Sequence, residues 1–386
     1  MFIDEINLLC YNKQKNEINL IWEFCNMKTL ILGDLCPKDN NYEYFKKMDL
    51  DALFSDTQDM FKNKDLVFAN LECAITESEN AIPKFGPNLK APYETALVAK
   101  KVGINLLGFS NNHIFDFGKE GMRDTFKAVK DAGLDYTGFG DNYEDSRKNY
   151  YFEKDGEKIA VVAVCEHEYT YALENRMGAR PFDEYDTLDD VREAKANADR
   201  VIVIYHGGKE FCQYPSPRVR KLYHAMAKHG ADVIVGQHSH CITCYEYVHD
   251  CHILYGQGNF HFVMPHDLEV WHTALMVEYD TKSHEIKFTP TRDNGIGIEL
   301  AKGEDKETIM REFEKRSKTL LDGTWRQHWH DFCMQNKVYI DVIRKAGDPD
   351  PNEQVNLIFG HYLDCEAHTD VWREFYPTFN QTNEID

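Results

Sequence analysis

The segment GADVIVGQHSHC, residues 230–241, carries the strongest indication of how this chain folds. It contains a short β-branched run at residues 233–235, which is bounded by glycine and suits a buried strand. Two histidines, His238 and His240, follow the run directly. Because they are two positions apart, an extended backbone would direct both side chains to the same side. The segment therefore predicts a buried strand that delivers two imidazoles to one place.

Similar apolar runs occur earlier in the chain, and each of them ends in polar residues. These runs lie at residues 30–32, 66–69, 104–109 and 201–205. Helical patterns that stop at glycine lie at residues 120–132 and 217–229. Strands that alternate with helices predict an α/β protein with a largely parallel sheet, in which ligands bind beyond the carboxyl ends of the strands. The residues at these ends are Asp34, Glu72, Asn112 and His206.

The polar residues at the strand ends combine three ligand types, namely carboxylate, amide and imidazole. This is the donor set of a binuclear site for borderline divalent metals. Two metals about 3.5–4 Å apart can share a carboxylate and a hydroxide that attacks in line. No single local segment could surround two ions, so each ligand would come from a different strand end. The sequence thus predicts a metal site formed by Asp34, Glu72, Asn112, His206, His238 and His240.

The excess of acidic residues limits the classes of molecule that this protein is expected to bind. The chain has 386 residues, with 44 Lys and Arg against 65 Asp and Glu, which gives a formal net charge of −21. This acidity argues against nucleic acid and against an anionic membrane surface, since both bind basic proteins. It does not exclude a small or polymeric anionic substrate, because bound metals or local cations such as Lys209 or Arg218 can reverse the field in a cleft. No apolar stretch is long enough to predict a membrane span.

The number of cysteines and the N-terminal sequence predict the cellular compartment of the protein. The chain has 11 cysteines, an odd number in a long chain, which argues against a disulfide scaffold. The first residues lack the features of a signal peptide, so we expect a cytoplasmic protein with reduced thiols. The segment 241–255 alternates like strands and suggests free buried cysteines. A structural zinc site is the competing interpretation, and its ligands would be Cys241, Cys244, His249, Cys251 and His252.

The sequence predicts three parts, and the residue composition changes near residue 296, where the third part begins. Residues 1–26 precede the first convincing strand and form an N-terminal extension, unless translation starts after them. Residues 27–295 form the α/β domain. Residues 296–386 are charged, aromatic and helical in period, and they predict an α-rich C-terminal appendage. Its core would contain Trp325, His328, Trp329 and His330.

Six motifs in order give the chain a resemblance to a known family. They are GDLCP (33–37), NLECAIT (70–76), GFSNNHIFDFG (108–118), YHGGKE (205–210), GADVIVGQHSHC (230–241) and YGQGNF (255–260). The set resembles the bacterial capsule-synthesis CapA-type family, which is linked to poly-γ-glutamate production. That family is a divergent branch of the calcineurin-like metallophosphoesterases. The resemblance covers roughly residues 27–295 and implies an αββα sandwich of two sheets flanked by helices.

The resemblance also implies a role for each site residue. Asp34 matches the aspartate of the first motif, and Glu72 stands where classical phosphoesterases place a bridging aspartate. His113 matches the histidine that assists the leaving group, and Asp116 is placed to orient it. The remaining metal ligands that the resemblance implies are Asn112, His206, His238 and His240.

Cys36 departs from the pattern of the parent superfamily, which begins with Asp-x-His and here has cysteine in the third position. A thiolate at Cys36 would be a soft ligand that favours zinc. Alternatively, the first metal site is weakened. The cofactor predicted from the resemblance is therefore one or two divalent ions, with Mn, Fe or Zn as the leading candidates.

The resemblance and the ligand set predict a metal-dependent hydrolase. A metal-bound hydroxide would attack a phosphoester or a related acyl or amide centre, and His113 would protonate the leaving group. The substrate would be anionic and linked to poly-γ-glutamate or capsule metabolism. The alternative is a non-catalytic component that retains the fold and binds the polymer or a partner protein.

Overall fold

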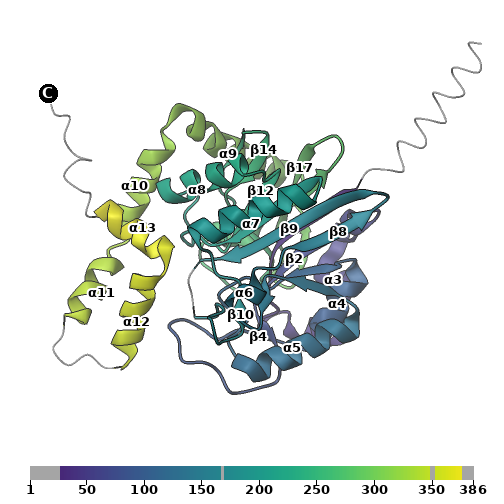
Figure 1. The fold of residues 1–386 in the computed structure, drawn as a ribbon, viewed down its shortest axis with the longest axis horizontal. Helices are drawn as coiled ribbons and strands as arrows, with labels where there is room; N and C mark the ends of the chain where they lie inside the picture. The colour runs from purple at the N-terminus through teal and green to yellow at the C-terminus, as the bar shows by residue number, and fades with distance from the viewer. Residues whose placement is uncertain (1–26, 167–168, 348–352, 376–386) are drawn as a thin grey trace, which may run out of the picture.

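The computed structural model describes residues 27–166, 169–347 and 353–375, and it contains two β-sheets packed face to face with helices on both outer sides (Figure 1). The first sheet has eight strands in the order β18-β17-β16-β1-β2-β5-β6, and β15 also pairs with β1. Strands β1, β2, β5 and β6 run parallel, whereas β16 to β18 extend the sheet in an antiparallel manner. Their bounds are β1 (Lys28–Leu35), β2 (Leu66–Leu71), β5 (Leu106–Gly108), β6 (Asp135–Thr137), β15 (Asn259–His261), β16 (Thr273–Asp280), β17 (Glu285–Asp293) and β18 (Ile298–Leu300).

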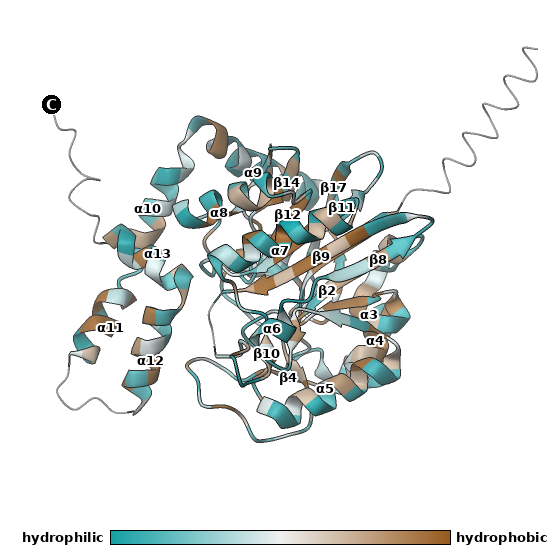
Figure 2. Ribbon diagram, in the orientation of Figure 1, coloured by the Kyte–Doolittle hydropathy of each residue, from teal (hydrophilic) through white to brown (hydrophobic). Residues whose placement is uncertain are grey.

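The second sheet has six strands in the order β13-β14-β12-β11-β9-β8. The four central strands run parallel, and the two edge strands are antiparallel to their neighbours. Figure 2 shows hydrophobic residues concentrated along β9, as expected for a strand that is covered on both faces. The strands are β8 (Tyr150–Lys154), β9 (Glu157–Cys165), β11 (Arg200–His206), β12 (Val233–Gln237), β13 (Tyr245–Val248) and β14 (Cys251–Leu254).

Alternating side chains of the central strands build three apolar layers. In β2, Leu66 and Phe68 join the core between the sheets, while Val67 and Ala69 join the core beneath the outer helices. Helices α4 (Glu94–Val102) and α5 (Gly118–Ala132) cover the first sheet, and α7 (Glu184–Asn197) and α8 (Pro217–Lys228) cover the second. The predicted αββα sandwich is therefore confirmed.

The C-terminal region is helical, as predicted, but its first helix belongs to the sandwich. Helix α9 (Gly303–Asp322) places Phe313 in the core between the sheets and Leu320 in the core beneath α7 and α8. The predicted boundary at residue 295 falls between β17 and β18, and β18 still pairs with the first sheet. A small core contains Trp329, Cys333, Tyr339 and Val371 together with Cys212 of the α/β part. Its helices are α10 (Trp325–Gln335), α11 (Val338–Ala346), α12 (Glu353–Asp364) and α13 (Glu366–Phe375).

Other expectations concern the cysteines, the membrane and the N-terminus. Cys241, Cys244 and Cys251 are buried and form no disulfide, and strands β13 and β14 occupy the segment 241–255 as predicted. None of the helices within the described ranges combines the length and apolar character that a membrane crossing requires. The predicted extension at residues 1–26 lies outside the described residues.

Glu246 of β13 predicts how stability depends on acid. Its carboxylate accepts hydrogen bonds from Arg220, His224 and Tyr255 at 2.7–3.1 Å. Burial alone raises the pKa of Glu246, but these bonds outweigh burial and lower the pKa to about 2 from an ordinary 4.5. Because the folded pKa is depressed, the stabilisation is present above pH 4.5 and is lost as the pH falls towards 2.

We therefore expect the free energy of unfolding of the wild type to lose about 2 kcal/mol through this group between pH 7 and pH 3. Urea titrations of the wild type and of Glu246→Gln at both pH values measure this component, which the variant should lack. Glu285→Gln, at an exposed position of β17, is the matched control. Equal pH slopes for the wild type and Glu246→Gln would contradict the assignment.

Candidate metal centre

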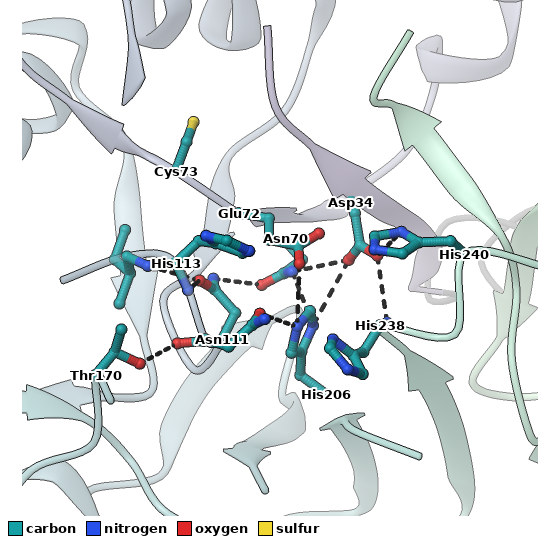
Figure 3. Close-up of polar contacts among 12 residues, drawn as sticks. Asp34, Asn70, Glu72, Cys73, Asn111, His113, Thr170, His206, His238 and His240 are labelled. Carbon is teal, nitrogen blue, oxygen red and sulfur yellow. Dashed lines mark hydrogen bonds and ion pairs between the residues drawn. The ribbon is translucent and has the colours of Figure 1, made fainter. Parts of the chain in front are cut away.

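Five predicted ligands from both sheets meet in one buried cluster. Asp34 lies near the end of β1, Glu72 follows β2, and His206 ends β11. His238 and His240 follow β12. Each of the five is at most 8% exposed. Figure 3 shows their side chains directed towards a common centre.

The cluster contains two overlapping groups of potential ligands. Glu72, His206 and His238 form one group, and Asp34, Glu72 and His240 form the other. Within each group the ligand atoms lie within 4.8 Å of one another. Glu72 belongs to both groups, as the sequence-based role of a bridging carboxylate requires. These donors match the oxygen and nitrogen ligands that borderline divalent cations prefer.

The carboxylate of Glu72 is the least satisfied polar group in the cluster. Its side chain is fully buried, and neither oxygen has a hydrogen-bond partner among the described residues. Nε2 of His206, a neutral ring, lies 3.4 Å from Oε1. Burial raises the pKa of Glu72 because it removes the charge from water. Such a group is costly to bury unless a cation compensates it, so this position fits a metal ion.

Asp34 adds a second buried carboxylate that is partly satisfied. Oδ1 accepts a hydrogen bond from Nδ2 of Asn70 at 2.8 Å, and Oδ2 accepts one from the backbone N–H of His238 at 3.3 Å. Burial and the neighbouring charge of Glu72 raise the pKa of Asp34 to about 6. Two carboxylates held this close repel each other, and divalent cations would remove that repulsion.

His206 is kept neutral and is bonded on both ring nitrogens. Its Nδ1 accepts a hydrogen bond from Asn70 at 3.1 Å, and its Nε2 donates to Oδ1 of Asn112 at 2.9 Å. Burial lowers the pKa of His206 to about 4, so the ring stays uncharged at neutral pH. Neighbouring ligand atoms on one metal lie about 3 Å apart, given metal–nitrogen distances of about 2.1 Å. The separation of His206 and Asn112 is therefore compatible with two ligands of one cation.

His238 and His240 reach the centre by a backbone that the sequence did not predict. We expected an extended backbone, but their φ angles are +77° and +51°, in the left-handed region. The expectation was wrong because bonds to residues far along the chain shape this turn. The backbone of His238 donates to Asp34, and Nδ1 of His240 donates to Oδ1 of Asn259 at 2.8 Å. Such conformations cost on the order of 1–3 kcal/mol each and persist where the surroundings enforce them.

His113 and Asp116 form a pair beside the ligand cluster. Nδ1 of His113 donates to Oδ2 of Asp116 at 2.7 Å. Asp116 also accepts a bond from the backbone of Leu89 at 2.7 Å and an ion pair from Lys84 at 2.6 Å. These contacts orient the imidazole, and an N–H at Nδ1 is the tautomer that fits the acceptor Asp116. Figure 3 places the ring of His113 next to Glu72, on the opposite side of the cluster from His240.

Cys36 lies outside both groups of potential ligands. It is buried, and burial together with the neighbouring thiol of Cys73 raises the pKa of the Cys36 thiol. In Figure 3 the sulfur of Cys73 points away from the cluster. The absence of Cys36 from both groups favours the alternative of a weakened first site over a thiolate ligand. Within the described part of the chain, Cys241, Cys244 and Cys251 are likewise absent from both groups.

The structure adds polar residues that sequence reasoning missed. Asn70 links Asp34 to His206, and Asn111 donates to Oδ1 of Asn70 at 3.0 Å and to the carbonyl of Leu71 at 2.8 Å. Both amides fall within the quoted motifs, and this was the available signal. Their function became evident only when the bonds between strands were known.

A cavity of about 260 Å³ opens beside the cluster. Asn112, His113 and His238 line its inner side, and the segments 84–87 and 208–210 line its flanks. Helices α12 and α13 form the opposite wall. Two larger hollows of about 460 and 580 Å³ contain none of the predicted ligands. The smaller cavity is therefore the one in which a substrate would meet the ligand cluster.

Comparison with known sequences identifies relatives of the α/β part of the chain. A family described as "Bacterial capsule synthesis protein PGA_cap" matches residues 28–264. The capsule biosynthesis protein CapA of Bacillus anthracis is 32% identical over 241 residues, which cover 60% of this chain and 59% of that protein. The PGA biosynthesis protein CapA of Bacillus subtilis (strain 168) is 32% identical over 216 residues, 55% of this chain and 57% of that protein. The chain thus spans less than two thirds of the length of these relatives.

Comparison with solved structures gives weaker similarities. A phosphatase from Mycoplasma pneumoniae has a TM-score of 0.44 and 16% identity, over 70% of this chain and 94% of its own. A putative 5′-nucleotidase from Staphylococcus aureus, crystallised with α-ketoglutarate, has a TM-score of 0.43 and 12% identity, over 75% of this chain and 58% of its own.

Proposed function

Since this chain belongs to the bacterial capsule synthesis family PGA_cap, as its motifs predicted, we propose that it is a metal-dependent hydrolase. The cluster of Asp34, Glu72, Asn112, His206, His238 and His240 would hold one or two divalent cations. The reaction would be hydrolysis of a phosphoester or of a related acyl or amide bond. The observation that carries the proposal is Glu72, a buried carboxylate shared by two ligand groups and lacking a hydrogen-bond partner among the described residues.

The cations would be held by residues from both sheets. Asp34 and His240 belong to one ligand group, His206 and His238 to the other, and Glu72 to both. The chemistry that bound divalent cations supply is activation of water and polarisation of the electrophile. Because the ligands are buried, the cluster excludes bulk water and strengthens every electrostatic interaction within it.

The proton for the leaving group would come from His113. Its Nδ1 is committed to Asp116, so Nε2 is the atom that can donate a proton into the cavity. Asp116 orients the imidazole, and Lys84 in turn holds Asp116 in place at 2.6 Å. This is the arrangement of a general acid with a positioning carboxylate.

The relatives suggest where such a reaction would act. Two of them are described as a capsule biosynthesis protein and a PGA biosynthesis protein. We infer that the substrate of this chain is an anionic small molecule or polymer of capsule or poly-γ-glutamate metabolism. The acidic surface makes selective binding within the metal-loaded cavity more favourable than general polyanion binding.

Elemental analysis of protein purified without chelator tests the proposal directly. We expect at least one equivalent of Mn, Fe, Zn, Ni or Co per chain. Hydrolysis of a panel of phosphoesters and γ-glutamyl amides should disappear with chelator and return when the metal is restored. Absence of bound metal, with no activity after addition of each metal, would contradict the proposal. Binding of a panel compound without turnover by metal-replete protein would favour the non-catalytic alternative.

A further inference from the structure

The wall of the cavity that faces the metal ligands is made by the C-terminal helices. His361 and Tyr362 of α12 and His368 of α13 line it, opposite His113 and His238. These side chains contact one another, since the rings of Tyr362 and His368 stack with centroids 4.3 Å apart. Figure 1 shows α12 and α13 side by side next to the sandwich. The cavity is therefore closed on one side by residues more than 90 positions after the last motif.

A buried ion-pair network fixes this wall to the sandwich. Nε of Arg218 on α8 binds Oδ2 of Asp370 on α13 at 2.9 Å, and Ser216 donates to the same oxygen at 2.6 Å. The guanidinium also pairs with Glu166, whose Oε2 accepts a bond from the backbone of Gly208 at 3.0 Å. Asp370 and Glu166 are at most 5% exposed. The network therefore joins α13 to the segment 207–210 and fixes the positions of these two sides of the cavity relative to each other.

The same network determines which positively charged side chain of the cavity is available to bind a substrate. The sequence offered Lys209 and Arg218 for this role. Arg218 is committed to Glu166 and Asp370, and Lys84 is paired with Asp116. Lys209 lines the cavity, and its ammonium forms no hydrogen bond or ion pair with any described side chain. It therefore supplies a positive charge that the protein itself does not neutralise by contact.

Glu210 supplies the opposite charge in the same cavity. It lines the cavity beside Lys209, and its carboxylate likewise makes no hydrogen bond or ion pair with the described residues. Burial alone raises the pKa of Glu210, but the neighbouring ammonium of Lys209 favours the charged form of its carboxylate. The carboxylate is thus ionised at neutral pH. The cavity therefore presents one uncommitted cation and one uncommitted anion on consecutive residues.

We propose that this cavity recognises a zwitterionic group, in which one carbon carries both an ammonium and a carboxylate, with Lys209 binding the carboxylate and Glu210 binding the ammonium. This inference rests on the proposed function and names its substrate class as an amino acid or the free end of a peptide chain. A dianionic phosphate monoester would face repulsion from Glu210. The volume of about 260 Å³ lies just below the range typical of drug-sized ligands, which suits one terminal residue better than the middle of a polymer.

Calorimetric titration of the metal-replete full chain with three probes tests this inference. The probes are γ-glutamyl-glutamate, its N-acetyl derivative and its N-terminal α-amide. Charge-assisted hydrogen bonds are worth enough that removing the ammonium or the carboxylate should weaken binding about 10- to 100-fold. Glu210→Gln should abolish the discrimination against the N-acetyl probe only. Lys209→Gln should abolish the discrimination against the α-amide only.

The controls separate this inference from the proposed function. Glu193→Gln and Lys221→Gln change the same charges at exposed positions outside the cavity and should leave all three affinities unchanged. Selective binding without bound metal or turnover would leave the zwitterion site standing and would contradict the hydrolase. Metal-dependent turnover without discrimination among the probes would overturn the zwitterion site alone. Inorganic phosphate binding that depends on Lys209 and is unchanged by Glu210→Gln would also overturn it, since that result describes a simple anion site.

Discussion

Replacing Glu72 with glutamine is expected to lower the metal affinity more than 100-fold, because the loss of an outer-shell partner alone typically costs 10- to 100-fold. Glu72 belongs to both ligand groups, so the variant should lose affinity at both positions. In the presence of chelator the same variant should be at least as stable as the wild type. Glutamine removes a buried charge that has no hydrogen-bond partner among the described residues.

Elemental analysis and urea unfolding, each with and without chelator, measure these two effects. We expect the wild type to be stabilised by metal and the Glu72→Gln variant to gain little, since ligand binding stabilises only in proportion to its affinity. Glu77→Gln changes an exposed carboxylate on the segment that follows β2 and serves as the matched control. A metal-free Glu72→Gln protein that is unfolded would show that Glu72 is a structural residue.

His113→Ala is expected to retain the full metal content and to lose about 10²- to 10⁴-fold in kcat, the usual contribution of a general acid. The loss should be smallest for substrates with good leaving groups, because these need no proton. His113 contacts Asp116 and belongs to neither ligand group, so removal of its ring should leave the metal ligands in place.

Steady-state kinetics with two phosphoesters of different leaving-group pKa, together with elemental analysis, check this expectation. His328→Ala removes an exposed histidine of α10 and should leave both metal content and kcat unchanged. A His113→Ala protein that loses metal would show that His113 supports a ligand rather than the leaving group. A uniform loss for both leaving groups would exclude the role of general acid.

The elements of the sandwich were predictable because their signals are local. The runs at residues 201–205 and 233–235 became β11 and β12, and the helical pattern at residues 120–132 became α5, which ends at Gly133 with φ +66°. The sequence did not reveal that α9 belongs to the sandwich. Its charged surface concealed the few residues, such as Phe313, that enter the core between the sheets.

The ligand cluster was predictable as a set, and its supporting contacts were not. Asp34, Glu72 and His206 stand out because each follows an apolar run. Asn70 stands in the same motif as Glu72, but its role depends on bonds to residues 36 and 136 positions away. The left-handed backbone of His238 and His240 also depends on such distant contacts. The spacing of residues along the chain does not indicate which of these distant contacts form.

The placement of α12 and α13 has a consequence for how such proteins can diversify. The family similarity covers residues 28–264, whereas the cavity wall comes from residues 361–368. The candidate metal centre and the opposite wall of the cavity thus come from separate segments of one chain, which are joined by contacts such as Arg218 with Asp370 and Tyr169 with Leu357. A different C-terminal segment that preserves these contacts could change which compound the cavity binds while every candidate metal ligand stays the same.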